Sequence, residues 1–298
     1  MKILCFGSLN LDNVYQVEHH VRSGETLASQ SLTQYPGGKG LNQSIALARA
    51  GANVYHAGQI GQDGERLVSL LKENGVNCKF VLQSQERTGH AIIQVDQNGQ
   101  NCILLYGGAN RTMQPAWMER VLAHFESGDI LLLQNEINGL PFLMKYAHEK
   151  GMQIALNPSP IDGGLFSLPL DTVRWFLLNE IEGEALTGVK EPKRICQKLL
   201  ENYPNAEMIL TLGSEGVCYQ SKDQKLVHPS YRVPVVDTTA AGDTFTGYFL
   251  AKISAGESVS YALECASKAA ALAVSQKGAA PSIPTIEEVQ RFDFPARE

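Results

Sequence analysis

The segment 235–249, VVDTTAAGDTFTGYF, joins the end of an apolar run to the start of a helical pattern through small residues. The pattern predicts a strand that ends near Asp237 and a helix whose apolar residues begin at Phe245. The residues between them are small enough for a phosphate to approach the backbone: Ala240, Ala241 and Gly242. Because the first N–H groups of a helix have no internal partner and carry the positive end of the dipole, this turn predicts an anion-binding site.

Asp243 follows these small residues directly, at the mouth of the predicted anion site. A carboxylate in a first helical turn can simply complement the helix dipole. Beside an incoming polyphosphate, however, a carboxylate is repelled by the negative charge of the phosphates. A carboxylate is expected in such a place if it must accept a proton from a substrate hydroxyl. We therefore predict that Asp243 is a general base, with the dipole role as the alternative.

A second glycine-rich turn, PGGKGLNQS at 36–44, precedes another helical pattern. It is not a Walker A loop, because Lys39 is followed by glycine rather than Ser or Thr, and it is not G-x-G-x-x-G, because Gln43 replaces the third glycine. Asn42 offers both a donor and an acceptor, which suits the hydroxyl groups of a polyol. The turn predicts a polyol site; taken alone, it is equally consistent with an ordinary entry into a helix.

These turns belong to a chain in which short apolar runs alternate with helix-period segments, as in KILCFG, LNQSIALARAG, DILLLQNE and LPFLMKYAHEKG. This alternation predicts an α/β fold with a Rossmann-like, doubly wound and mostly parallel sheet. In such folds the ligand crevice lies beyond the carboxyl ends of the strands. Polar residues follow the apolar runs at several such ends, namely Asn10, Asp12, Glu136, Asn157, Asn179, Glu182, Thr211, Asp237 and Asp243.

Two regions, about 12–35 and 88–108, lack this alternation. The second contains two strand patterns around Asn98 and Gly99, a pair that suits the positive φ angles of a tight hairpin turn. We expect the two regions to form a small antiparallel sheet attached to a single domain of residues 1–298. The alternative is an extension of the edge of the main sheet.

The overall composition excludes several classes of protein. With 25 Lys and Arg residues against 31 Asp and Glu, a net charge of -6, the chain lacks the basic footprint expected for binding nucleic acid or an anionic membrane. No apolar run approaches the length of a membrane-spanning helix, and we expect a cytoplasmic protein. The six cysteines form no C-x-x-C pair and favour free thiols over disulfides. The histidines lack the spacing of a zinc site.

The sequence resembles the ribokinase family of carbohydrate kinases, also called phosphofructokinase-B-type sugar kinases. The matching blocks follow the order of the family along nearly the whole chain: N-L-D at 10–12, G-E-T at 24–26, G-G-K-G-L-N-Q at 37–43, G-G-A-N at 107–110, N-P-S-P at 157–160, N-E-I-E at 179–182, T-L-G-S-E-G at 211–216, D-T-T-A-A-G-D-T-F at 237–245 and K-G-A-A-P-S-I-P at 277–284. The chain departs from the usual pattern at Leu41 and Ser44, where alanines are common, and at His90, where a small or apolar residue is common.

The resemblance implies a role for each matched residue. Asp243 corresponds to the catalytic base, and the amides of Ala240, Ala241 and Gly242 correspond to the anion hole. Sugar-contacting positions are Asn10, Asp12, Gly38, Lys39, Asn42 and Glu136. Nucleotide-contacting positions are Asn179, Thr211, Gly213, Ser214, Gly216 and Ser267, with Glu182 linked to magnesium and phosphate through water. Positions that hold a monovalent cation, several of them through backbone carbonyls, are Asp237, Thr239, Ala273, Gln276, Gly278 and Ser282.

The resemblance also implies a fold and an activity. The family combines a Rossmann-like core with a β lid that closes over the sugar, and its members often dimerise through the lid. The implied substrates and cofactors are a small sugar, ATP, Mg²⁺ and K⁺. We expect an ATP-dependent kinase for a primary hydroxyl group, with O5 of D-ribose as the favoured acceptor. The alternatives are fructose, another furanose or a nucleoside as acceptor, and a catalytically silent sugar-binding regulatory protein.

Overall fold

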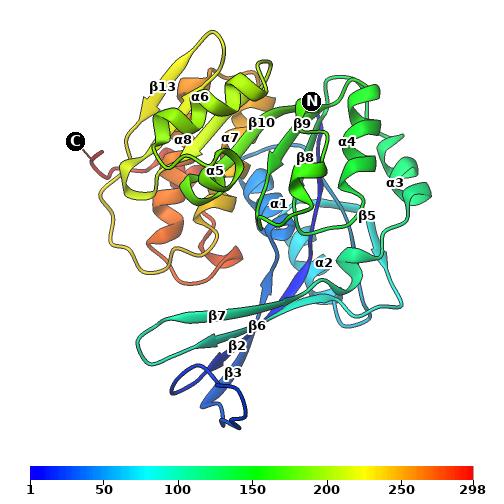
Figure 1. Ribbon diagram of the computed structural model, residues 1–298, viewed down its shortest axis with the longest axis vertical. Coiled ribbons are helices and arrows are strands. Elements are labelled where there is room, and N and C mark those ends of the chain that lie inside the picture. Colours follow the sequence, from blue (N-terminus) through cyan, green and yellow to red (C-terminus); the bar gives the residue numbers. More distant parts are fainter. Residues whose placement is uncertain (298) are drawn as a thin grey trace.

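The computed structural model describes residues 1–297 and contains a central nine-stranded sheet (Figure 1). In spatial order its strands are β13 (Lys225–His228), β12 (Val217–Gln220), β11 (Glu207–Thr211), β10 (Val173–Asn179), β9 (Gln153–Asn157), β8 (Ile130–Gln134), β1 (Ile3–Phe6), β4 (Val54–Ile60) and β5 (Asn77–Gln83). All pairs from β5 to β11 are parallel, whereas β12 and β13 are added antiparallel at one edge. The predicted α/β class and mostly parallel sheet are confirmed.

Helices cover both faces of this sheet, which is why its central strands are apolar at every position rather than at every second one. In β1, Ile3 and Cys5 belong to one core cluster, and Leu4 and Phe6 belong to the other. The helices of the first cluster are α1 (Lys39–Arg49), α2 (Glu65–Glu73), α7 (Ala241–Ser254), α8 (Val259–Val274) and α9 (Ile286–Gln290). The helices of the second cluster are α3 (Pro115–Leu122), α4 (Leu140–Glu149), α5 (Glu180–Thr187) and α6 (Pro192–Asn202).

A separate four-stranded sheet projects from the core (Figure 1). Its spatial order is β3 (Ser31–Gly37), β2 (Asn10–Gln16), β6 (Gly89–Val95) and β7 (Asn101–Tyr106). We call these strands the small sheet. They come from the two regions expected to form it, and they are not an extension of the edge of the main sheet.

The expectation that the small sheet is antiparallel throughout is wrong, because its central pair, β2 and β6, is parallel. The physical reason lies in the main sheet: β2 follows β1 and β6 follows β5, and these preceding strands point the same way. The β6–β7 hairpin is present, but its turn is longer than expected. Only Gly99 of the predicted pair has positive φ (75°), and the Asp96 carboxylate accepts the N–H groups of Asn98 and Gln100.

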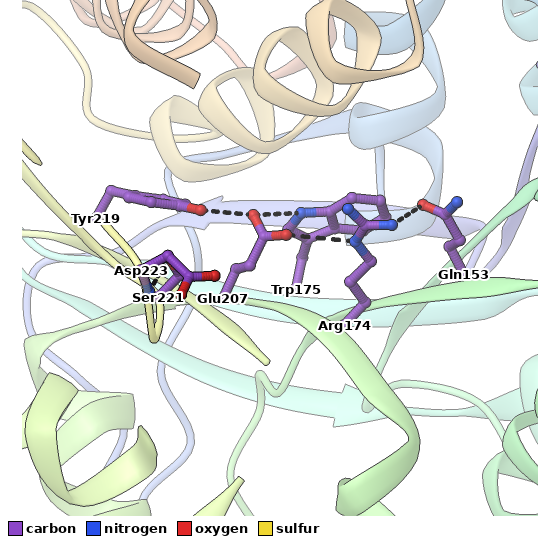
Figure 2. A network of polar contacts seen from close by, with 7 residues as sticks. All are labelled: Gln153, Arg174, Trp175, Glu207, Tyr219, Ser221 and Asp223. Carbon is purple, nitrogen blue, oxygen red and sulfur yellow. Dashed lines mark hydrogen bonds and ion pairs between the residues drawn. The ribbon is translucent and has the colours of Figure 1, made fainter. Parts of the chain in front are cut away.

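The amino ends of the strands are tied by polar contacts around Glu207 (Figure 2). The Glu207 carboxylate accepts Trp175 Nε1 at 3.1 Å and the Tyr219 hydroxyl at 2.7 Å, and it pairs with Arg174 Nε at 3.3 Å. The Arg174 guanidinium also lies over the Trp175 ring, 4.5 Å from its centroid. Arg174 Nη1 also donates to Gln153 Oε1 at 2.9 Å, so the network joins β9, β10, β11 and β12. The predicted site residues lie at the opposite edge of the sheet, beyond the carboxyl ends of the strands.

Candidate active site

The start of α7 has the geometry of an anion site. Ala240, the N-cap residue, has φ 59°, and it is the one non-glycine residue with positive φ among residues 1–297. A left-handed alanine costs roughly 1–2 kcal/mol, so the surrounding structure must impose this turn. The N–H groups of Gly242 and Asp243 have no hydrogen-bond acceptor in the described part of the chain, whereas Ala241 N–H contacts Thr238 O at 3.3 Å.

Asp243 lies in the first turn of α7 and is buried, with two side-chain amides of α1 on its carboxylate. Asn42 Nδ2 donates to Oδ2 at 3.0 Å, and Gln43 Nε2 donates to Oδ1 at 2.8 Å. Asn42 Oδ1 is also buried but has no partner among the described residues. An unpaired buried acceptor beside a carboxylate is suited to accept a hydrogen bond from a hydroxyl group of a ligand.

The glycine-rich turn before α1 brings further predicted sugar residues together. Gly38 has φ 96°, and a Cβ on it would lie 3.0 Å from Ser8 O, so this turn requires glycine. Lys39 N–H then donates to Glu136 Oε2 at 3.0 Å, and the Ser8 hydroxyl donates to the same oxygen. The turn is therefore packed against Ser8 and Glu136. This packing accounts for the glycines of the turn just as well as the alternative explanation, which is close approach of a ligand.

Charged groups of this cluster perturb one another. Burial and the nearby Glu136 raise the pKa of Asp12 to about 6, and burial raises the pKa of Glu136 as well. Burial alone would lower the pKa of Lys39, but the neighbouring carboxylates, of which Asp243 acts most strongly, outweigh it and raise this pKa. Lys39 is therefore the cation that offsets several carboxylates in one place.

Asn10 completes the predicted sugar set at the start of β2. Its Oδ1 accepts Asn110 Nδ2 at 2.8 Å, and Asn110 Oδ1 accepts the N–H of Leu9 at 3.0 Å. Asn110 belongs to the 107–110 block of the sequence, yet sequence analysis gave it no role. A Cβ on Gly89 would lie 2.1 Å from Asn110 Nδ2, so β6 also approaches this asparagine pair closely.

The predicted nucleotide residues line two adjoining cavities. The larger, about 370 Å³, contains Thr211, Gly213, Ser214, Gly216, Gly242 and Ser267 in its wall, as well as Tyr231, Val233, Val235 and Arg297, which sequence analysis missed. The smaller, about 210 Å³, is lined by Lys39, Asn157, Asn179, Glu182, Thr211, Gly242 and Asp243, among others. Thr211 and Gly242 belong to both walls, so the cavities lead from the strand ends to Asp243.

Asn179 and Glu182 form a capping box at the start of α5. Asn179 Oδ1 accepts Glu182 N–H at 2.9 Å, and Glu182 Oε2 accepts Asn179 N–H at 3.0 Å. This arrangement satisfies two backbone donors of the helix end and fixes both side chains in the wall of the smaller cavity. It leaves Asn179 Nδ2 as a donor for a ligand.

The residues matched to a cation site lie beside the anion turn, and side-chain contacts join only some of them to one another. Asp237 Oδ1 accepts the N–H of Thr239 at 2.9 Å and its hydroxyl at 2.6 Å, and Oδ2 accepts Gly278 N–H at 2.9 Å. Burial by itself would raise the pKa of Asp237, but these hydrogen bonds outweigh that effect and lower the pKa. The Ser282 hydroxyl donates instead to Ala279 O, and Gln276 N–H donates to Ala273 O.

Comparisons with known proteins show what the whole chain is similar to. The pfkB family of carbohydrate kinases matches residues 1–286. The chain is 34% identical to a ribokinase of Bacillus subtilis over 98% of this chain and 99% of that protein. A crystal structure of a ribokinase from Cryptococcus neoformans in complex with ADP has a TM-score of 0.87 at 32% identity and covers 97% of this chain and 99% of that one. An Arabidopsis thaliana ribokinase complexed with ribose and ATP has a TM-score of 0.85 at 30% identity and covers 98% and 97%.

Proposed function

Because the chain belongs to the pfkB family of carbohydrate kinases, we propose that it transfers the γ-phosphoryl group of ATP to O5 of D-ribose, giving ribose 5-phosphate and ADP. The observation that carries this proposal is the position of Asp243. It lies between the hydroxyl-binding groups around Asn42 on one side and the cavities that reach Thr211 on the other. The curated relative and the two solved structures described above are named as ribokinases, and one of them holds ribose and ATP.

Each site group has a task in this reaction. Asp243 accepts the proton of the sugar hydroxyl while the oxygen attacks the γ-phosphorus and the bond to the bridging oxygen breaks. The free N–H groups at the start of α7 stabilise the charge that develops on the transferred group. Asp12, Asn10, Asn42 and the Gly38–Lys39 turn bind the other hydroxyls, with Glu136 holding the turn.

The three departures from the family pattern add no side chain to the proposed sugar contacts. Leu41 is fully buried in the core. Ser44 contacts His56 Nδ1 at 2.8 Å. His90 pairs with Leu11, while its neighbour Ala91 pairs with Asp12, so its side chain is on the opposite face of the small sheet from Asp12. None of the three therefore argues against ribose.

We propose Mg²⁺ and K⁺ as cofactors. Glu182, fixed in the wall of the smaller cavity, would orient water on Mg²⁺, which when bound neutralises phosphate charge. The Asp237 carboxylate links the loop before α7 to Gly278 and would attract a monovalent cation beside the anion turn. Exchanging K⁺ for a bulky organic cation at constant ionic strength should lower the rate; an unchanged rate would contradict the cation site.

We also propose that the small sheet is a lid and that two lids pair in a homodimer. The face that carries Asp12 also carries Val14, Ile93, Ile103 and Leu105, and Ile103 and Leu105 are 56% and 44% exposed. Such a surface is suited to pack on a second copy of itself. A closed lid would exclude water, which competes with the sugar for the phosphoryl group.

For its location we propose the cytoplasm, where ATP is available. All six cysteines are free thiols, as predicted, and Cys5, Cys196, Cys218 and Cys265 are buried. None of the helices in the described chain is long and apolar enough to span a bilayer.

The test is ATP consumption across pentoses, hexoses and nucleosides with identification of the products. D-ribose should give the highest kcat/KM and 2-deoxyribose a lower one, because a missing hydroxyl leaves buried polar groups unpaired. Asp12→Ala should damage sugar use and spare ATP binding. If fructose or a nucleoside exceeds ribose by about tenfold or more, ribose is the wrong acceptor and the family activity alone remains.

A further inference from the structure

Gln43 is a fully buried residue of α1 whose side chain contacts three other polar side chains. Its Nε2 donates to Asp243 Oδ1 at 2.8 Å and to Asn157 Oδ1 at 3.2 Å, and its Oε1 accepts Gln134 Nε2 at 2.6 Å. Both amide hydrogens and the carbonyl oxygen are therefore engaged. A side chain satisfied in this way has one orientation only.

The direction of these hydrogen bonds is fixed from both ends. Asn157 Nδ2 donates to the backbone carbonyl of Leu177 at 2.9 Å, so Asn157 must turn its oxygen toward Gln43. A carboxylate at Asp243 can only accept. Gln43 must therefore present its NH₂ group to both residues and its oxygen to Gln134.

Gln134 anchors this chain of contacts in the main sheet. It is the last residue of β8, it is fully buried, and its Nε2 also lies 3.6 Å from Cys5 Sγ of β1. A Cβ on Gly7 would lie 2.4 Å from Gln134 Oε1, so the side chain rests directly on the backbone that follows β1. The central strands thus define the position of Gln134.

We propose that Gln43 and Gln134 form an amide relay that holds the carboxylate of Asp243 in its reactive orientation. The proposal rests on the proposed function, in which Asp243 is the base. Asn42, the other amide on this carboxylate, has a second task at the sugar and can shift with it, whereas the remaining contacts of Gln43 are with the buried side chains of Asn157 and Gln134. A neutral donor orients the carboxylate and avoids the stronger engagement of an ion pair. Gln43 and Gln134 are positioning residues.

The test compares Gln43→Met, which keeps the approximate shape but removes both donors, with Ser44→Ala. Gln43→Met should lower kcat by about 10- to 30-fold, because small misplacements of a reacting group have effects of up to about 100-fold. The KM for the sugar and the KM for ATP should each change by less than about twofold. Ser44 is the adjacent, equally buried residue, and it contacts His56 rather than Asp243. Ser44→Ala should therefore keep kcat within about twofold. Gln134→Met should also lower kcat, by a smaller factor than Gln43→Met.

A double-mutant cycle separates positioning from a general structural effect. In an Asp243→Asn background, Gln43→Met should change the residual rate by less than about twofold, because its partner's function is already lost. Equal fold losses in both backgrounds would overturn the relay. If Gln43→Met does not fold, the same cycle with Gln134→Met decides the question.

The outcomes also separate this inference from the proposed function. Near-normal turnover by a folded Asp243→Asn protein would remove the base itself. Loss of turnover in Asp243→Asn together with full activity of Gln43→Met would reject only the relay.

Discussion

Asp243 accepts hydrogen bonds from Asn42 and Gln43, and Gln43 can only donate. In Asp243→Asn the new NH₂ group must therefore face Asn42, whose unpartnered Oδ1 can turn to accept it. Asparagine is nearly isosteric, so the start of α7 and both cavities should persist in Asp243→Asn. We expect kcat to fall by about 10²–10⁴-fold, the range for loss of general-base assistance, while the KM for ATP changes little. Steady-state kinetics with a binding measurement for ATP checks this. Normal turnover would leave Asp243 with the helix-dipole role only.

Asp12 makes the stability of the sugar-free protein depend on pH. Its pKa is about 6 in the folded protein against an ordinary value of 3.8, so between these values the folded state binds more protons than the unfolded state. Stability should therefore fall as pH rises from about 4 to 7, and Asp12→Asn should remove roughly 1–2 kcal/mol of that fall after allowance for partial exposure. Urea unfolding of both proteins at several pH values measures it. Identical pH slopes for the two proteins would show that Asp12 does not titrate in this way.

At the scale of elements, the capping box of α5 joins helix stability to the nucleotide site. Asn179→Ala removes the cap and should lower the free energy of unfolding by about 0.5–2 kcal/mol as well as weaken ATP binding. Asn179→Asp retains the acceptor for Glu182 N–H but replaces a donor by a negative charge near the phosphates. It should keep the stability and raise the KM for ATP. Thermal unfolding and ATP kinetics on both variants test this; equal ATP affinity in Asn179→Asp and the unmodified protein would exclude contact with the nucleotide.

At the scale of the whole molecule, adjacent residues of β7 offer a matched pair for the proposed dimer. Ile103 lies on the face of Asp12, and Leu104, which is 67% exposed, lies on the other face. Ile103→Glu should shift the protein to monomer and raise the sugar KM, because burying a charge between two lids is unfavourable. Leu104→Glu should leave the mass unchanged. Light scattering after size-exclusion chromatography reads the mass, and a monomer without any substitution would exclude the dimer.

The sequence predicted what depends on local pattern and missed what depends on tertiary pairing. The α/β class, the parallel sheet and the positions of the strand ends follow from apolar runs, and these were confirmed. The parallel pairing of β2 with β6 has no local signal, because it depends on the direction of β1 and β5. In the sequence, Gln43 stands out only as the residue that breaks a glycine motif, since nothing there reveals that it meets Gln134 and Asp243. Arg297 reaches the larger cavity because Ala296 pairs with Tyr231, again a distant contact.

The contacts of α1 with α7 have a consequence for the chain during synthesis. Asn42 and Gln43 are separated from Asp243 by 201 and 200 residues. At bacterial and eukaryotic translation speeds that interval lasts roughly 10–40 s. Through it, the face of α1 that packs on Gly247 of α7, including Ala46 and Leu47, has no α7 to cover it. The growing polypeptide therefore carries an uncovered apolar helix that molecular chaperones can bind, and it cannot phosphorylate a sugar until α7 has left the ribosome.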